Sequence, residues 1–543
     1  MLIFLVLLSL ILVITAGCVV YFSNYVDNHA YSCENLSSVF PAIENDFARD
    51  CGSSDALANN CLIHHLLGFK YNMKSTFVTR STLTGGHAEV KRRGISEDII
   101  MKKTLGLTAA LILSASGAMA QDDVESEMTY SVSPLTQAIA LDYDAHLKNL
   151  YEHFHANPEL SFVENKTAAR MAEELRALGY DVTEGVGGTG VVAVLKNGDG
   201  PTVMMRADMD GLPVKENSGL SYASRVMQKD RNGQEFSVHH ACGHDIHITS
   251  MVGYAKVMQD MKSEWSGTLV LIVQPAEEII AGAKAMIDDG LFTRFPKPDY
   301  VIGFHVWSNL APGKIIIESG TVMSSSDSVY ITLRGVGAHG ASPHQGLDPI
   351  VLGSAVVMNL QTIVTRNVAP LKPGIITVGT FHAGTKNNII PHEAKLGLTI
   401  RSDDPETREK LLAGIKRITE NTARAYGVPD ELMPIIEHAP NRTPPTINNA
   451  EVVNIVRGAL ETEMADHLVR RPRDGMGAED FAYLMAPETG VKGVYFSVGG
   501  SIEEDVSKSP SHHSPEFNVL PEPSITAGTE AMVRGAIALF NQG

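Results

Sequence analysis

The sequence predicts an α/β fold in which one domain is inserted into another. Between residues 135 and 323, apolar strands alternate with helices, an order typical of an α/β domain whose sheet is largely buried. Between residues 324 and 440 the order becomes strand, helix, strand, strand, helix, strand, which is the ferredoxin-like β-α-β-β-α-β unit. Residues 441–543 return to the first pattern, so we expect them to complete the first domain. The length also favours several domains, because single cores stop growing beyond roughly 250–300 residues.

The first domain is predicted to open with two helices. One covers about residues 136–155 and ends before Pro158, and the other covers about residues 166–178, with Gly179 as its stop signal. The second helix has an apolar face at helical spacing, made of Ala168, Met171, Ala172 and Leu175. Four apolar runs after these helices are predicted to be strands: GVVAVLKNG, PTVMMRAD, GTLVLIVQPAEE and DYVIGFHV.

The inserted domain is predicted from a change in the pattern after residue 323. Its first strand, SDSVYITLRG, alternates as a half-exposed strand does, and a helix is expected over residues 349–366. Two strands follow, GIITVGTFHAG and EAKLGLTIRS, and then a second helix over about residues 406–426. A last strand is expected near residues 432–438.

Two apolar segments near the N-terminus stand apart from this fold. Residues 1–22 are long enough to span a bilayer but lack the positive start of an export signal. Residues 101–120, MKKTLGLTAALILSASGAMA, have the ordered parts of a signal peptide. An export signal acts at the start of a chain, so we expect translation to begin at Met101 and residues 1–100 to be a non-native extension. The alternative is a genuine N-terminal anchor and linker, with residues 101–120 as a second apolar helix.

These segments bear on location and on the cysteines. A signal peptide at residues 101–120 predicts a periplasmic or secreted protein, which would be membrane-anchored if residues 1–22 are genuinely translated. Cleavage after Ala120 would leave Cys242 as the one cysteine, so no internal disulfide is expected. The formal net charge of −18 argues against a nucleic-acid partner, which would require a basic surface.

Four groups of ligand-type residues lie at predicted strand ends or in loops. They are Cys242-Gly243-His244-Asp245, Pro275-Ala276-Glu277-Glu278, His305, and Ser511-His512-His513-Ser514-Pro515. Ligands in α/β sheets gather outside the carboxyl ends of strands. A thiolate, imidazoles and carboxylates together suit zinc or a similar transition metal. Two adjacent carboxylates directly after a buried strand are costly unless a cation neutralises them.

Each of these groups also has a simpler interpretation. A single histidine at a strand end is more often structural, and a Glu-Glu pair is usually a solvated helix start. Two histidines in a row arise by chance in a chain with 20 of them. Cys242 alone could be a metal ligand, an acyl-accepting nucleophile or a small buried residue.

Taken together and in order, the motifs resemble one family. The chain is similar to the dinuclear metal amidohydrolases and peptidases that include aminoacylase, carboxypeptidase G and hippurate hydrolase, and most similar to the branch of hippurate hydrolase and the auxin-conjugate hydrolases. The matching stretches are HANPELSFVE, RADMDGLPV, HACGHDIH, QPAEE, GFHV, GAHGASPHQGLDPI, NIIP, GMGAEDFAYL and HSPEF, which cover nearly all of residues 136–543. The resemblance implies a catalytic α/β domain with a mixed central sheet, plus an inserted ferredoxin-like lid and dimerisation domain.

The resemblance also implies a metal site with two divalent ions per subunit, which could be zinc, manganese, cobalt or nickel. Five residues match its protein ligands: Cys242, His244, Glu278, His305 and His513. His513 is preferred to His512 because it stands directly before Ser-Pro, as in the family.

Further residues match the family's catalytic and substrate-binding positions. Glu277 matches the general acid/base, and Asp208 matches a carboxylate that orients a ligand histidine. His339, in the inserted domain, matches a residue that steadies the oxyanion, in some cases across a dimer. Asn388 and Arg401 match groups that hold the substrate's free carboxylate, although Arg401 could also be a solvated strand end.

Other residues in the motifs are predicted to have supporting roles. His239, His247 and His344 are expected to be structural or to support ligands, and Asp210, Glu479 and Asp480 could support loops or helices. Asn388 is preferred to its neighbour Asn387 because of its register with the following Ile-Ile-Pro.

The predicted function is metal-dependent hydrolysis of the amide bond of N-acyl or N-aroyl amino acids, with a small-molecule substrate and a homodimer formed through the lid. The alternative enzyme is a dipeptidase or carboxypeptidase using the same site. Two other classes stay open: a cysteine hydrolase with Cys242 as nucleophile, and a non-catalytic binding protein.

Overall fold

The computed structural model describes residues 133–542. The predicted extension over residues 1–100 and the predicted signal peptide over residues 101–120 lie outside the described residues. In the described part, no helix combines the length and the apolar character that crossing a membrane requires.

The described chain opens with the two predicted helical segments. The first is helical from α5 (Pro134–Asp142) through a π-helical turn, η2 (Tyr143–Leu147), to α6 (Lys148–Ala156). The hydroxyl of Ser133 caps its start by accepting from the backbone N–H of Thr136. The second is α7 (Asn165–Ala177), which buries the four residues predicted to form its apolar face.

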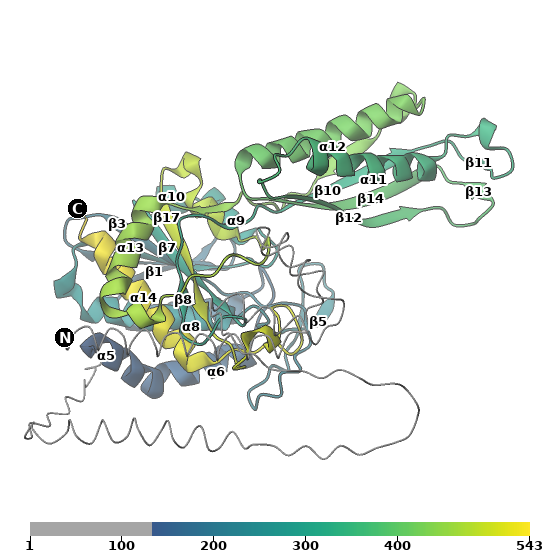
Figure 1. Cartoon of the computed structure of the whole chain (residues 1–543). Helices are drawn as coiled ribbons and strands as arrows, with labels where there is room; N and C mark the ends of the chain where they lie inside the picture. The colour runs from purple at the N-terminus through teal and green to yellow at the C-terminus, as the bar shows by residue number, and fades with distance from the viewer. Residues whose placement is uncertain (1–132, 543) are drawn as a thin grey trace, which may run out of the picture. The chain divides into compact units, whose positions relative to one another are not determined.

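A seven-stranded mixed sheet forms the centre of the main domain, which confirms the predicted α/β class (Figure 1). Its strands in spatial order are β1 (Asp181–Val186), β2 (Gly190–Asn197), β6 (Gly267–Gln274), β3 (Thr202–Asp208), β7 (Tyr300–Trp307), β17 (Lys492–Gly499) and β8 (Ile315–Ile316). The four strands β6, β3, β7 and β17 run parallel, while β1, β2 and β8 pair antiparallel. The carboxyl ends of β6, β3 and β7 therefore meet at one edge of the sheet.

Both faces of this sheet are covered. In its central strands the residues facing one side and those facing the other side are both apolar, so each face packs in a core of its own. Along β6, Leu269, Leu271 and Val273 pack in the larger core cluster, while Val270 and Ile272 pack in a second cluster. The helices packing in the larger cluster include α6, α7, α8 (His244–Asp260), α13 (Ala450–Glu463) and α14 (Pro521–Phe540). The second cluster contains α9 (Gly282–Asp288) and α10 (Leu291–Arg294).

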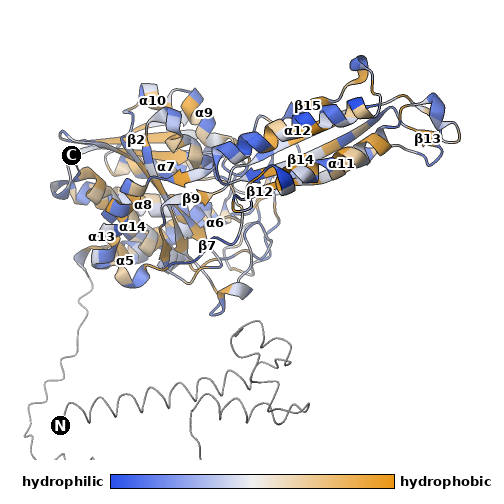
Figure 2. Ribbon diagram, turned by 45° about the horizontal axis from the view of Figure 1, so that its top comes forward, coloured by the Kyte–Doolittle hydropathy of each residue, from blue (hydrophilic) through white to orange (hydrophobic). Residues whose placement is uncertain are grey.

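The elements between β10 and β15 follow one another as strand, helix, strand, strand, helix, strand. They are β10 (Asp327–Arg334), α11 (Pro349–Arg366), β12 (Gly374–Ala383), β14 (Glu393–Ser402), α12 (Pro405–Ala425) and β15 (Ile435–His438). The four strands form an antiparallel sheet in the order β12-β14-β10-β15, with its own apolar core. Many residues of α12 are hydrophilic, as expected for a helix with one solvent-facing side (Figure 2).

Small pairings that the sequence pattern does not predict complete the fold. Within the inserted domain, β11 (Ala338–His339) pairs with β13 (Ile389–Ile390), beyond the end of α11 (Figure 1). The others are β4 (Met227–Lys229) with β5 (Glu235–Ser237), and β9 (Gly320–Met323) with β16 (Thr446–Asn448). The last strand of the inserted domain is shorter than predicted, because residues 430–432 form a 3₁₀ turn before it.

Candidate metal centre

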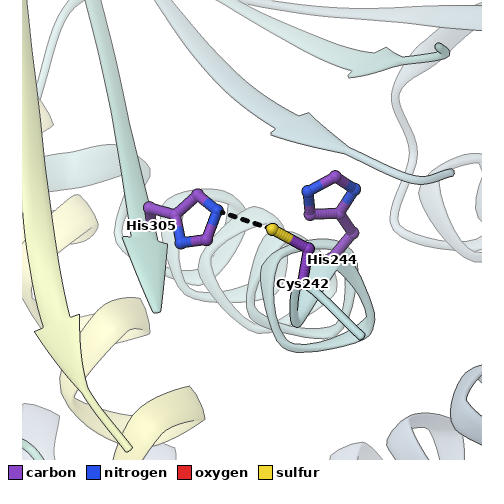
Figure 3. A group of neighbouring side chains, drawn as sticks. All are labelled: Cys242, His244 and His305. Carbon is purple, nitrogen blue, oxygen red and sulfur yellow. Dashed lines mark hydrogen bonds between the residues drawn. The ribbon is translucent and has the colours of Figure 1, made fainter. Parts of the chain in front are cut away.

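The predicted ligands and Glu277 come from strands of the central sheet, from the loops after them and from the start of a helix. Glu277 and Glu278 lie just after β6, His305 lies near the carboxyl end of β7, and Cys242 and His244 lie at the start of α8. Figure 3 shows the side chain of His305, from β7, next to those of Cys242 and His244, from the start of α8. The meeting of parallel strand ends thus brings together residues far apart in the sequence.

The distances between these side chains are those of a ligand cluster. Sγ of Cys242 is 3.4 Å from Nε2 of His305. The two carboxylate oxygens of Glu278 lie 4.0 Å from Nε2 of His244 and 3.4 Å from Nε2 of His513. Within each of three overlapping groups, the ligand atoms lie within 4.8 Å of one another: Cys242–His244–His305, Cys242–Glu278–His513 and His244–Glu277–Glu278. The structure therefore brings all five predicted ligands together, although their binding of metal stays a prediction.

Unsatisfied atoms in this cluster fit a cation. Nε2 of His244 and Oε1 of Glu278 are buried and have no hydrogen-bond partner among the described residues. Leaving such atoms unpaired costs on the order of 1–3 kcal/mol each, more if charged, and a bound cation would satisfy both. Burial also raises the pKa of the free Cys242 thiol well above its usual range, so a cation is what would hold it as thiolate.

Gly243 is required between the two ligands that begin α8. Its φ of +82° lies in the left-handed region, which L side chains rarely adopt. A Cβ there would lie 2.4 Å from Cγ1 of Val306. Glycine thus lets the chain turn so that Cys242 and His244 both reach the cluster.

Carboxylates hold the backbone of the loop that carries Glu277 and Glu278. The N–H groups of these two residues donate to Oδ1 and Oδ2 of Asp210, both at 3.0 Å. The preceding N–H, of Ala276, donates to Oε1 of Glu164 at 2.9 Å, and Ala276 itself has a positive φ of 52°. Asp210 therefore supports this loop, one of the roles that the sequence left open for it.

Asp210 also fixes the ring of His244. Nδ1 of His244 donates to the backbone carbonyl of Asp210 at 2.9 Å, which leaves Nε2 free for the cluster. Asp208, predicted to orient a ligand histidine, lies with Oδ2 3.4 Å from Nε2 of His244, and its shortest histidine contact is with His247, 2.5 Å from Oδ1 to Nδ1. Nε2 of His247 accepts from the N–H of Val306 at 2.9 Å. Both nitrogens of His247 are thus engaged, in keeping with a structural role.

The geometry of the C-terminal loop favours His513 over His512. Nε2 of His512 donates to the carbonyl of Val306 at 3.0 Å, and burial lowers the pKa of this histidine to about 4. His513 has a positive φ of 65°, and its Nε2 faces Glu278. His305 is held in a similar way, since its Nδ1 donates to Val306 at 2.6 Å and its Nε2 points to Cys242.

A buried charge network that the sequence did not predict lies beside Glu277. Arg206 is 2% exposed and donates to Asp208 and Glu479, each at 2.7 Å. Burial, together with the negative charge of Glu479 and Glu278, raises the pKa of Glu277 well above its usual range. Burial likewise raises the pKa of Glu278 to about 8, against the lowering effect of His244. In the sequence, the one indication that Arg206 and Glu479 belong near the site is that they lie in the RADMDGLPV and GMGAEDFAYL motifs.

His339, predicted to steady the oxyanion, and Asn388 and Arg401, predicted to bind the substrate carboxylate, lie in the inserted domain and are not part of this cluster. His339 and Asn388 line one cavity of about 800 Å³, and Gly340 joins their segments by donating to the carbonyl of Asn388 at 2.8 Å. Arg401 lies elsewhere, donating to Ser326 Oγ and to the carbonyl of Ile400. Among the described residues, no hydrogen bond or ion pair links these three side chains to the metal-centre side chains.

Comparison with known proteins agrees with the ligand cluster. Residues 204–537 match the family model described as Peptidase family M20/M25/M40. This chain belongs to that family. The M20 relationship confirms the predicted resemblance and makes the chain a metal-dependent amidohydrolase.

Similarity to individual M20 proteins covers most of their length. Hippurate hydrolase of Campylobacter jejuni is 38% identical over 348 residues, which are 63% of this chain and 86% of that protein. Thermostable carboxypeptidase 2 of Saccharolobus solfataricus is 36% identical over 364 residues, 66% of this chain and 87% of that protein. The crystal structure of the Bacillus subtilis YXEP protein, described as a dinuclear metal-binding peptidase of family M20, is 26% identical with a TM-score of 0.61, covering 75% of this chain and 99% of that one.

Proposed function

We propose that this M20 amidohydrolase cleaves the amide bond of N-acyl or N-aroyl amino acids to a carboxylic acid and a free amino acid. The observation that carries the proposal is that one thiol, three imidazoles and the carboxylates of Glu277 and Glu278 form overlapping groups of ligand atoms, each within 4.8 Å. The similarity to a hippurate hydrolase supports this substrate class, since that relative is named for an N-aroyl amino acid.

We propose that Cys242, His244, Glu278, His305 and His513 hold two divalent ions, of zinc, manganese, cobalt or nickel. Ions bound there would supply an activated water and a polarised scissile carbonyl. Glu277 takes the proton from the attacking water and delivers it to the leaving nitrogen, as a general base and then a general acid. The Asp210 clamp on the Glu277 and Glu278 N–H groups holds the loop in place during this transfer.

The inserted domain supplies the remaining groups in this proposal. His339 steadies the negative charge that develops on the carbonyl oxygen, and Asn388 and Arg401 hold the free carboxylate of the amino acid. A homodimer formed through the inserted domain would allow His339 of one copy to serve the metal centre of the other. The oligomeric state in solution, measured by sedimentation, tests this part directly.

A substrate panel tests the proposed reaction. Purified enzyme loaded with manganese, zinc or cobalt is assayed on N-benzoylglycine, other N-acyl amino acids and unblocked dipeptides. The proposal predicts faster release of amino acid from the N-acyl substrates. Rapid cleavage of dipeptides with inert N-acyl substrates would instead establish the dipeptidase or carboxypeptidase alternative, which the similarity to a carboxypeptidase supports.

Chelation separates the metal mechanism from a cysteine hydrolase. Activity that is lost in a chelator and restored by added metal supports the proposal. Activity that survives the chelator but is lost on thiol alkylation would identify Cys242 as a nucleophile.

We further propose that the enzyme acts outside the cytoplasm, on the basis of the signal-peptide pattern at residues 101–120. Sequencing the N-terminus of exported material tests this. A first residue of Gln121 is expected, whereas an intact segment 1–100 would refute the predicted start at Met101 and the cleavage after Ala120.

A further inference from the structure

A second group of ligand-type side chains shares no residue with the metal centre. Nε2 of His155, from α6, is 3.1 Å from Oε1 of Glu216, and Nε2 of His239 is 3.8 Å from the same oxygen. The three ligand atoms lie within 4.8 Å of one another. The side chains of His239 and Glu216 are fully buried, and that of His155 is 3% exposed. These three residues form the His155–Glu216–His239 cluster.

His239 is the residue in this cluster that needs an explanation. Neither of its ring nitrogens has a hydrogen-bond partner among the described residues, although both are buried. Each unpaired buried nitrogen costs on the order of 1–3 kcal/mol, and groups of this kind are rare in folded proteins. The contact of Nε2 with Glu216, at 3.8 Å, is too long for a hydrogen bond.

His155 is oriented as metal-binding histidines usually are. Its Nδ1 lies 2.7 Å from Oδ2 of Asp245, and since a carboxylate can only accept, Nδ1 carries the proton. A carboxylate on one ring nitrogen, with the other nitrogen facing a ligand cluster, is the arrangement that fixes the tautomer of a ligand histidine. Glu216 is held too, because its Oε2 accepts from the N–H of Ser224 at 2.5 Å.

A protonated His155, without a metal ion, would explain less of the geometry of the cluster. If Nε2 of His155 were also protonated, it would form an ion pair with Glu216, and the cluster would be an imidazolium between two carboxylates. Burial opposes that charge, but Asp245 and Glu216 raise the pKa of His155 to about 9, so the ion pair is a real competitor. It leaves His239 with two unsatisfied nitrogens, whereas one cation between the three ligand atoms also satisfies Nε2 of His239.

We propose that the His155–Glu216–His239 cluster binds a divalent transition-metal ion of the zinc type, separate from the ions of the metal centre. Two imidazoles and one carboxylate are a zinc ligand set, with metal–ligand distances of about 2.0–2.2 Å. The spacings of 3.1 and 3.8 Å between ligand atoms are compatible with such a position. The ion would have a structural role, because it would link α6, which carries His155, to the loop that carries Glu216 and to the segment after β5 that carries His239. Through Asp245, which holds His155, this link would extend to the first turn of α8, where His244 also lies.

Counting zinc in matched variants tests this site. Wild type, His239→Leu and His240→Leu are purified with zinc present, desalted and measured for zinc per subunit by mass spectrometry. His240 is the control, since it is equally buried, has two nitrogens without partners and forms no ion pair among the described residues. We expect His239→Leu to hold one equivalent fewer than both other proteins, and to melt at a lower temperature than wild type.

Three results would overturn the proposal. Equal zinc in wild type and His239→Leu would show that no ion depends on this histidine. An equal loss in His240→Leu would show that the loss comes from disturbed packing and not from a missing ligand. If His239→Leu does not fold, crystals of the wild type grown with zinc decide the matter: anomalous scattering at the zinc edge must place a peak between the three ligand atoms. A map without that peak refutes the site, whatever the activity of the enzyme.

Discussion

The metal centre and the cavity around His339 differ in how firmly their side chains are held. In the metal centre, His244, Glu277 and Glu278 are all anchored through Asp210. Apart from His513, whose side chain is 56% exposed, the side chains of the cluster are buried or nearly so. In the inserted domain, His339 is exposed, and within the described part of the chain the one hydrogen bond to its ring, at 3.0 Å, comes from the nearby N–H of Ala341. The comparison indicates a firmly held cluster of candidate ligands and a separate, loosely held group of residues predicted to contact the substrate. Changes in the second group should not affect metal binding or stability.

The largest effect is expected for Glu277→Gln. Loss of the group that moves the proton should lower kcat by about 10²–10⁴-fold on N-benzoylglycine, while the metal content stays that of wild type. The measurement is kcat together with metal per subunit. The adjacent Glu278→Gln is the matched control, since Glu278 faces His244 and His513 and its loss should reduce the metal content. Unchanged turnover in Glu277→Gln would revive the non-catalytic binding protein.

The next effect is expected for His339→Ala, which tests the comparison most directly. If His339 stabilises the oxyanion, kcat should fall by about 10²–10³-fold, the usual loss for one such donor. Because the side chain is exposed and lies outside the ligand cluster, Tm and metal content should not change. His382→Ala, which lines the same cavity, serves as the control with near wild-type kcat. Metal loss in His339→Ala would break the distinction between the two regions.

A smaller effect is expected for Asp210→Asn. The amide keeps one acceptor oxygen but places an NH₂ group against the N–H of Glu277 or Glu278, so the loop should shift. Metal affinity should fall about 10–100-fold, as for other residues that support ligands, with kcat largely recovered at saturating metal. Activity measured against buffered free metal gives the affinity. Ser161→Ala removes the hydroxyl that donates to the same carboxylate at 2.6 Å, and a loss as large as that of Asp210→Asn would contradict the clamp.

The sequence was sufficient for those parts of the molecule that short-range patterns determine. Runs such as GTLVLIVQPAEE show a buried strand and the acidic pair after it in a single segment, so the strand and the position of Glu277 and Glu278 could be predicted together. The supporting contacts could not, because they join residues far apart. Arg206 and Glu479 are separated by 273 positions, and which backbone carbonyl accepts from His244 depends on the turn after β3. The periodicity of apolar residues along the chain carries no information about such long-range contacts.

The smallest effect is expected for Arg401→Ala, where the two interpretations of one residue give different results. The guanidinium donates to Ser326 and to the carbonyl of Ile400 and is only partly exposed, which suits a structural role. If it also holds the substrate carboxylate, KM for N-benzoylglycine should rise about tenfold, worth about 1.4 kcal/mol, with kcat retained. Ser326→Ala removes the same internal contact but keeps the charge, so its KM should stay near wild type. A fall in Tm shared by both variants, with KM unchanged in each, would assign Arg401 to the fold of the inserted domain and leave the substrate carboxylate to Asn388.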